Sequence, residues 1–170
     1  MVKEKYGNMP KINFWESGIR WIWLTVLVIA LDRISKEMAQ YYLSMDHAWQ
    51  VMPGFNLILS YNKGAAFSFL DGANGWQVFF FGIIAVIASV ALAIWLIRIP
   101  WQRFSECIAL SLIIGGALGN LWDRLHYGQV IDFIQWYAGN YYWPTFNIAD
   151  SAICVGAVLL VGGSWFQKKS

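Results

Sequence analysis

Charged residues are scarce in this chain of 170 residues, since Asp, Glu, Lys and Arg together make up 13% of it. A soluble domain carries about 25% charged residues. The net charge of +2 is too small to indicate nucleic-acid binding. Hydrophobic residues, by contrast, make up 58% of the chain. This composition excludes an ordinary soluble domain and indicates a membrane protein whose single domain covers residues 1–170.

Several chemical signatures are missing as well. The two cysteines, Cys107 and Cys154, lie in apolar runs without CxxC or metal-ligand spacing, so we expect no disulfide, no metal site and no cofactor. There is no HExxH and no GxSxG motif, which excludes the commonest zinc-peptidase and serine-hydrolase signatures. Ser35 and Lys36 are adjacent, and neighbouring residues on a helix do not face each other, which disfavours a Ser–Lys pair.

Long apolar runs are what the chain has instead. A helix that crosses a bilayer needs about 20 mainly apolar residues, and four segments qualify, at about 15–38, 76–97, 105–125 and 147–166. Eleven Trp and eight Tyr residues suit aromatic belts at two membrane interfaces. The sequence therefore predicts an all-α membrane protein with four transmembrane helices and a small β element.

The cations beside these segments predict the orientation, because cytoplasmic loops are enriched in Lys and Arg. With both termini in the cytoplasm, the cytoplasmic side holds Lys3, Lys5, Lys11, Arg20, Arg98, Arg103, Lys168 and Lys169, and the outer side holds Arg33, Lys36, Lys63 and Arg124. Eight cations against four favour this N-in, C-in arrangement.

Two longer segments would then lie outside the cytoplasm. Residues 48–75 contain alternating stretches and turn signals at Pro53-Gly54 and Asp71-Gly72, which predict short strands that form a β cradle on the membrane surface. Residues 126–146 are aromatic and too short to span, so we expect a loop or a short interfacial helix in the headgroup layer.

Polar residues of the predicted helices gather near their outer ends, and such residues are functional candidates by default. Asp32 and Lys36 are four residues apart and can form an ion pair on one helix face. Asp123 and Arg124 are adjacent and point in different directions, so each needs its own partner; Arg124 alternatively extends to lipid phosphate. The Gly115–Gly119 spacing indicates close helix packing.

Asp150 and Asp132 are the carboxylates whose apolar surroundings make their charge most unfavourable. Asn147 followed by Asp150 is a helix-capping pattern, which by itself accounts for an acid there. Asp132 lies between apolar neighbours, where an unpaired carboxylate is unfavourable. Two such groups at one depth predict a dyad that shares one proton, with one carboxylate activating water and the other protonating the leaving amine. The helix N-terminus favours Asp150 as the base and Asp132 as the acid, although a dyad titrates as a unit.

Five stretches of the chain can be compared with the motifs of known families: "LDRISK" (31–36), "NKGAAFSF" (62–69), "GGALGNLWDR" (115–124), "GQVIDFI" (128–134) and "PTFNIADSAI" (144–153). In these stretches and in their order the chain resembles the lipoprotein signal peptidases, also called type II signal peptidases. The stretches cover the chain from the first predicted helix to the fourth and are specific in combination. The first stretch departs from the family by having Arg33 where a Gln or similar residue is expected.

The resemblance implies a monomeric aspartic endopeptidase of the bacterial cytoplasmic (inner) membrane, with a β cradle and an extracytoplasmic interfacial helix. It implies cleavage of diacylglyceryl-modified prolipoproteins just before the lipidated cysteine, contact with membrane lipid, and inhibition by globomycin. It assigns Asp132 and Asp150 as the catalytic pair and Asp32 and Lys36 as a structural pair. The implied substrate- and inhibitor-binding positions are Asn62, Gly64, Asn120, Asp123, Arg124 and Asn147.

Two other functions remain open from the residues alone. A small transporter or proton-coupled channel would use the same carboxylates, but it needs polar groups along the whole depth of a pathway. The second predicted helix carries no charge, which disfavours a channel. A non-catalytic assembly factor, in which the acids only cap and pair, would tolerate Asn at position 150. Flux in liposomes tests the first function, and the effect of that substitution tests the second.

Overall fold

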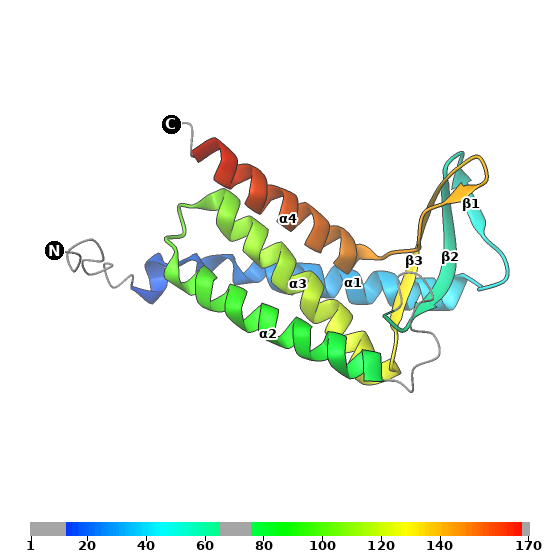
Figure 1. Cartoon of the computed structure of the whole chain (residues 1–170), viewed down its shortest axis with the longest axis horizontal. Helices are drawn as coiled ribbons and strands as arrows, with labels where there is room; N and C mark the ends of the chain where they lie inside the picture. Colours follow the sequence, from blue (N-terminus) through cyan, green and yellow to red (C-terminus); the bar gives the residue numbers. More distant parts are fainter. Residues whose placement is uncertain (1–12, 65–75, 168–170) are drawn as a thin grey trace.

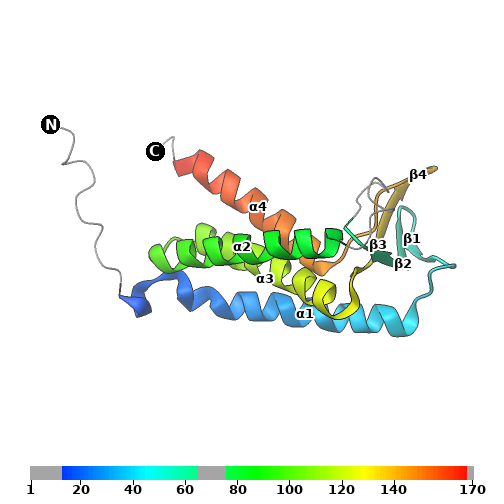
Figure 2. The same ribbon diagram turned by 60° about the horizontal axis from the view of Figure 1, so that its bottom comes forward.

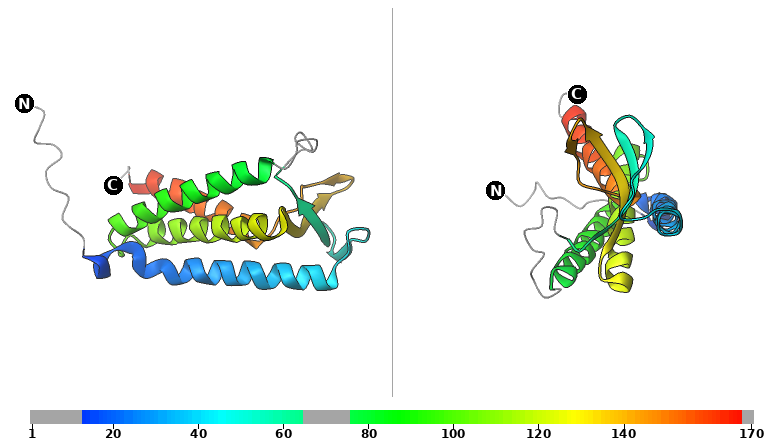
Figure 3. Two further views of the ribbon diagram at one scale, coloured as in Figure 1. Left: turned by 90° about the horizontal axis from the view of Figure 1, so that it is seen from below. Right: turned by 90° about the vertical axis from the view of Figure 1, so that its right-hand side faces the viewer.

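The computed structural model describes residues 13–64 and 76–167, which form a helix bundle with an antiparallel sheet at one end (Figure 1). Two short 3-10 helices, Phe14–Glu16 and Gly18–Trp21, precede α1. The α-helices are α1 (Ile22–Tyr42), α2 (Trp76–Arg98), α3 (Phe104–Tyr127) and α4 (Ile148–Gln167). The side views show the sheet at the end where α1 and α3 finish and where α2 and α4 begin (Figure 3).

The predicted helix positions agree with the structure except at the first helix. α2, α3 and α4 lie within about two residues of their predicted limits, whereas α1 begins at Ile22 and continues to Tyr42. α2 and α3 are each long and apolar enough to cross a membrane, and α4 has a shorter apolar part, Ile148–Gly162. A mostly helical fold with a small sheet and two such helices fits a membrane enzyme.

α3 lies between the other helices and packs against all three of them (Figure 2). The predicted close approach occurs at the glycines of its middle. A Cβ atom on Gly115 would lie 2.8 Å from the Cβ atom of Val28 in α1, and one on Gly119 would lie 2.7 Å from a carboxylate oxygen of Asp32. Larger side chains at these positions would therefore push α1 away from α3.

Gly128 ends α3 and allows the chain to turn into the sheet. Its φ of 67° lies in the left-handed region, and its N–H donates to the carbonyl of Arg124 at 3.1 Å. Glycine adopts this conformation without the strain that a side chain would add, which makes it a common helix terminator. The strand that follows begins only two residues later, so the end of α3 and the start of that strand are held close together.

The sheet contains β1 (Trp49–Met52), β2 (Phe55–Asn62), β3 (Val130–Ala138) and β4 (Tyr141–Tyr142), paired antiparallel in that order. The predicted turn at Pro53-Gly54 connects β1 to β2, with Gly54 at φ 88°. The other predicted turn, Asp71-Gly72, lies outside the described residues. β2 and β3 place Ser60 opposite Asp132 and Asn62 opposite Val130.

The prediction of a loop or interfacial helix at 126–146 is wrong. Val130–Ala138 is a strand, and its last residue is separated from Tyr141 by Gly139 and Asn140 alone. The sequence contains the signal for this hairpin, since Gly-Asn between β-branched and aromatic runs is typical of a two-residue turn. The segment pairs with β2, and this pairing gives its backbone the hydrogen bonds that a lone interfacial loop lacks.

The arrangement of the ends is consistent with the predicted orientation. α1 begins, α2 and α3 connect, and α4 finishes at the end away from the sheet (Figure 3). Arg98 and Arg103 belong to the α2–α3 connection, and Arg20 precedes α1. The terminal lysines that complete the predicted cytoplasmic set lie outside the described residues, so the orientation itself stays a prediction.

Candidate active site

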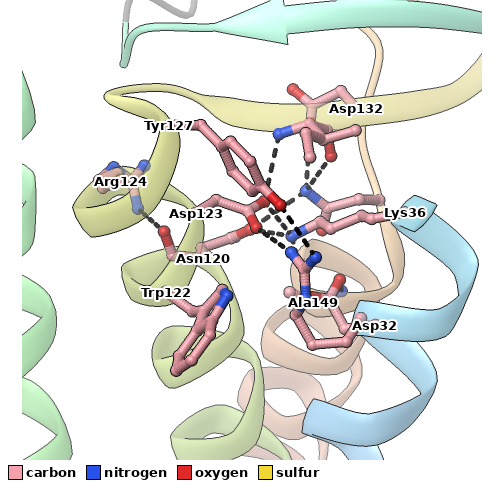
Figure 4. A network of polar contacts seen from close by, with 12 residues as sticks. Asp32, Lys36, Asn120, Trp122, Asp123, Arg124, Tyr127, Asp132 and Ala149 are labelled. Carbon is pink, nitrogen blue, oxygen red and sulfur yellow. Dashed lines mark hydrogen bonds and ion pairs between the residues drawn. The ribbon is translucent and has the colours of Figure 1, made fainter. Parts of the chain in front are cut away.

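A network of polar side chains fills the space where α1, α3, β3 and the first turn of α4 meet (Figure 4). Six of its members are buried although all are polar or charged: Asp32, Lys36, Asn120, Asp123, Asp132 and Asn147. Burial of so many polar groups is unfavourable unless they are paired. Their partners define the site.

Lys36 is the centre of the buried charges. Its ammonium group is 2.8 Å from Asp32 Oδ2, as the four-residue spacing predicts, and 2.8 Å from Asp123 Oδ2 of α3. It also donates to Asn120 Oδ1 at 3.0 Å. All three charged side chains are fully buried, so one cation faces two carboxylates out of contact with water.

Arg33 supplies the second cation of this group, and the sequence reasoning did not select it. Its guanidinium donates to Asp123 Oδ1 at 2.7 Å, and the side chain is 16% exposed. Its outer part contacts the exposed Glu37 at 3.2 Å and the Tyr127 hydroxyl at 3.4 Å. The available signal was its position next to a buried acid and four residues before Glu37.

Asn147 and Asp150 cap the N-terminus of α4 reciprocally. Asn147 Oδ1 accepts from the Asp150 N–H at 2.9 Å, and Asp150 Oδ2 accepts from the Asn147 N–H at 3.2 Å. This is the capping pattern predicted from the sequence. Asp32 Oδ1 accepts from the next free N–H, that of Ala149, at 3.0 Å. The buried charges of α1 therefore also hold the start of α4.

The Asn147 amide connects this cap to Asp132. Its Nδ2 donates to Asp132 Oδ1 at 2.7 Å and is also 3.1 Å from Asn120 Oδ1 and 3.2 Å from the Ile131 carbonyl. Asn120 Nδ2 in turn donates to Asp150 Oδ1 at 2.7 Å. The two predicted catalytic carboxylates thus come from different elements and share Asn147 as a partner, while Asn120 contacts both Asp150 and the Asn147 amide.

Asn62 holds the second oxygen of Asp132 from the end of β2. Its Nδ2 donates to Asp132 Oδ2 at 3.1 Å, while its Oδ1 accepts from the Gly64 N–H at 2.8 Å. The bond from Gly64 orients the amide so that its NH₂ group faces the acid. Gly64 has a φ of 99°, and a Cβ atom there would lie 2.6 Å from the Phe81 ring, so the turn requires glycine.

Burial, and after it the nearby carboxylate of Asp150, raise the pKa of Asp132, which is about 7. The hydrogen bonds from Asn62 and Asn147 oppose this shift, as does the charge of Lys36, but they do not cancel it. Asp132 is 1% exposed, whereas Asp150 is only partly buried. The site therefore contains one carboxyl group that readily holds a proton near neutral pH beside a second one that solvent reaches.

Arg124 lies on the side of α3 that faces α2, away from Lys36 (Figure 4). It donates to the Asn120 carbonyl at 3.3 Å, and its guanidinium carbon is 5.6 Å from the centre of the Phe81 ring. Its Nε is buried without a hydrogen-bond partner among the described residues. It borders an apolar groove of about 590 Å³ between α2 and α3, lined by Phe79, Ile83, Ile87 and Leu121 among others.

The predicted site residues thus fall into two groups. Asn62, Gly64, Asn120, Asn147, Asp132 and Asp150 contact one another directly or through one partner. Asp123 belongs to the other group, because its two oxygens are taken by Arg33, Lys36 and the Ile131 N–H at 3.2 Å. Asp123 is fully buried and serves to hold β3 against α1 and α3. Within residues 13–64 and 76–167, no three His, Cys, Asp or Glu side chains are arranged to hold a metal ion.

Comparison with known families gives the same assignment as the motifs. The family model for signal peptidase (SPase) II matches residues 24–166. This chain belongs to the signal peptidase II family. Related lipoprotein signal peptidases include one from Coxiella burnetii, 50% identical over 83% of this chain and 86% of that protein. Another, from Photorhabdus laumondii, is 49% identical over 89% of this chain and 90% of that protein.

Solved structures extend the agreement to the fold. A bacterial membrane enzyme determined by the in meso method at 2.3 Å is similar with a TM-score of 0.76 and 31% identity, over 88% of this chain and 89% of that one. A second bacterial membrane enzyme, determined by the same method at 1.9 Å, is similar with a TM-score of 0.74 and 32% identity, over 85% of this chain and 91% of that one. Signal peptidase II membership makes the chain a protease, and the network at the sheet end of the bundle is its candidate active site.

Proposed function

We propose that this protein removes the signal peptide from diacylglyceryl-modified prolipoproteins by cleaving just before the lipidated cysteine, with Asp132 and Asp150 as its catalytic pair. One observation supports this most strongly. Asn147 contacts both carboxylates, because its side-chain amide donates to Asp132 of β3 and its backbone N–H donates to Asp150 of α4. The buried Asp132, with a pKa of about 7, holds a proton near neutral pH. Membership of the signal peptidase II family gives the reaction class.

The proposed chemistry needs one ionised and one protonated acid. Asp150, which solvent reaches, accepts a proton from water as the water oxygen attacks the scissile carbonyl carbon. Asp132 donates a hydrogen bond to the carbonyl oxygen and stabilises the negative charge that develops there in the tetrahedral intermediate. When this intermediate collapses, the carbonyl re-forms, the proton on Asp132 passes to the leaving amine, and the C–N bond breaks. The proton on Asp150 then moves to Asp132, which restores the starting pair.

The asparagines would hold the carboxyl groups of Asp132 and Asp150 in a fixed orientation. Asn62 and Asn147 each donate to one oxygen of Asp132, which fixes the plane of that carboxyl group. Asn120 does the same for Asp150. Such donors act through position rather than through their own proton transfer. Gly64 acts through Asn62, and Asp32 and Lys36 act through the start of α4.

The surroundings of the pair suit a lipidated peptide. The apolar groove between α2 and α3 is open to the side of the bundle and offers a place for an acyl chain, with Arg124 at the polar end beside the catalytic pair. On the sheet, a hollow of about 540 Å³ lined by Ser60, Gln135 and Thr145 offers polar contacts to the peptide. Asp132 lies opposite Ser60 in the sheet, and Ser60 lines this hollow.

In the bilayer, we propose that all four helices span, with both termini in the cytoplasm of a bacterium and the sheet on the outer face of the inner membrane. α1 has 21 residues and α4 has 20, close to the length that a span needs. The active site then lies at headgroup level, where a diacylglyceryl cysteine presents its peptide bond. We propose a monomer, since the catalytic pair is complete within one chain.

Product analysis tests the reaction. Purified protein is incubated with two synthetic precursors that differ only in the diacylglyceryl group on the cysteine, and the products are identified by mass spectrometry. We expect cleavage of the lipidated precursor alone, a new N-terminus at the lipidated cysteine, and inhibition by globomycin. Cleavage at another bond, or equal cleavage of both precursors, would contradict the proposed specificity.

A further inference from the structure

The four buried or half-buried charges beside the catalytic pair balance one another only when Arg33 is included. Asp32 and Asp123 each carry a negative charge, and Lys36 contacts both at 2.8 Å. With Lys36 alone, this group would keep one excess negative charge in a place where no side chain is exposed. Arg33 approaches the far oxygen of Asp123 at 2.7 Å and brings the sum to zero.

This group is connected to both catalytic acids. Asp123 Oδ2 accepts from the N–H of Ile131, the residue before Asp132. Lys36 donates to Asn120, which donates to Asp150. Asp32 holds the Ala149 N–H, one residue before Asp150. A change in the charge of the group therefore reaches the pair through short paths in a site of low polarity, where Coulomb interactions are strong.

We propose that Arg33 is a positioning residue of the peptidase, which neutralises the buried group of Asp32, Lys36 and Asp123 and so keeps Asp132 and Asp150 in the charge states that cleavage needs. Arg33 does not touch the pair. Its guanidinium is fixed from outside by the Tyr127 hydroxyl and ring, at 3.4 Å and 5.7 Å. The contact with Glu37 is exposed to solvent and therefore contributes little. The inference rests on the proposed function, because it concerns the same catalytic pair.

The charges that act directly on Asp132 are those of Asp150 of α4, Lys36 of α1 and Arg124 of α3. The same elements also carry Asp32 and Arg33 of α1 and Asp123 of α3, and the exposed Lys63 follows β2. Loss of Arg33 leaves all the others in place and adds one uncompensated negative charge. That charge disfavours ionisation of Asp132, so its pKa rises. Loss of the Asp123 charge does the opposite.

The test measures kcat/KM for the lipidated precursor against pH in the wild type and in three variants, Arg33→Gln, Asp123→Asn and the double variant. Activity is lost at high pH where Asp132 gives up its proton. We expect this alkaline limit to move up by about one pH unit in R33Q and down by about one unit in D123N. In the double variant the charges balance again, and the limit returns to that of the wild type.

Two controls separate charge from folding. R33K keeps the cation and should keep the alkaline limit of the wild type. E37Q removes only the exposed contact with Arg33 and should change neither the alkaline limit nor kcat/KM. Thermal unfolding shows which variants are folded at each pH. An unmoved limit in R33Q and D123N, or a shift of both in the same direction, overturns the inference. A wild type that does not cleave the lipidated precursor overturns the proposed function instead.

Discussion

Substitution of Asn147 separates the helix cap from the catalytic pair. Its Oδ1 caps α4 by accepting from the Asp150 N–H at 2.9 Å, and its Nδ2 donates to Asp132 at 2.7 Å. Serine can replace the cap oxygen but has no amide to reach Asp132, whereas alanine replaces neither. N147S therefore tests the contact with Asp132, and the comparison with N147A measures the cap.

The magnitudes follow from these contacts. Loss of an N-cap costs about 1 kcal/mol, so the free energy of unfolding of N147A should be about 1 kcal/mol lower than that of N147S. Both variants leave the buried Oδ1 of Asp132 without its donor, at a cost of about 1–3 kcal/mol, whereas Asn120 Oδ1 keeps its bond from Lys36. The lost hydrogen bond opposes the raised pKa of Asp132, so that pKa rises further above about 7. We expect the alkaline limit of cleavage to move up by about one unit, and kcat/KM to fall by about 10²-fold because the Asp132 carboxyl is no longer oriented.

The assay combines denaturation in detergent with kcat/KM for the lipidated precursor between pH 5 and about 9, a window that brackets the pKa of Asp132. If N147S cleaves at nearly the wild-type rate with an unmoved alkaline limit, the Asn147–Asp132 contact does not matter for catalysis. If N147A is as stable as N147S, the cap reasoning is wrong.

Two further predictions concern stability. The pKa of Asp132 is about 7 in the folded protein and near 3.8 in an unfolded chain, so the folded state binds the proton more tightly, and this contribution to stability is lost as pH rises from about 4 to about 7. The unfolding temperature of D132N should therefore fall less over this pH range than that of the wild type. Parallel curves of unfolding temperature against pH would contradict the raised pKa. G119A should lower the free energy of unfolding by about 1–3 kcal/mol, because the new Cβ atom lies too close to Asp32. The control G162A places its Cβ atom where no other atom lies within 4 Å, so it should be neutral or stabilising. Equal effects of the two substitutions in chemical denaturation would refute the close packing at Gly119.

Local patterns were enough to predict the helices and several contacts. Apolar runs of about 20 residues identified α2, α3 and α4 to within about two residues, because length and composition decide such segments. The four-residue spacing predicted the Asp32–Lys36 pair, and the three-residue spacing predicted the cap between Asn147 and Asp150. Each of these depends on neighbours within one turn of one helix.

Features that depend on tertiary contacts were predicted less well. β3 was missed because its strand partner, β2, lies about 70 residues earlier in the chain, with α2 and α3 between the two strands in the sequence. The role of Arg33 depends on Asp123, 90 residues away in sequence. Asp123 stays a predicted binding residue, and its ion pairs with Arg33 and Lys36 were not predicted from the sequence. A single sequence shows the polar residues but not which of them meet.

Replacement of Asp132 or Asp150 by Asn tests whether the two acids act together on the scissile bond. The measurement is single-turnover cleavage of the lipidated precursor by D132N and by D150N, beside E37Q as a matched control in the same detergent. We expect the rate to fall by on the order of 10³-fold or more in each catalytic variant, with both variants folded and with the rate of E37Q unchanged. Cleavage by either D132N or D150N within a few-fold of the wild-type rate would contradict their joint action.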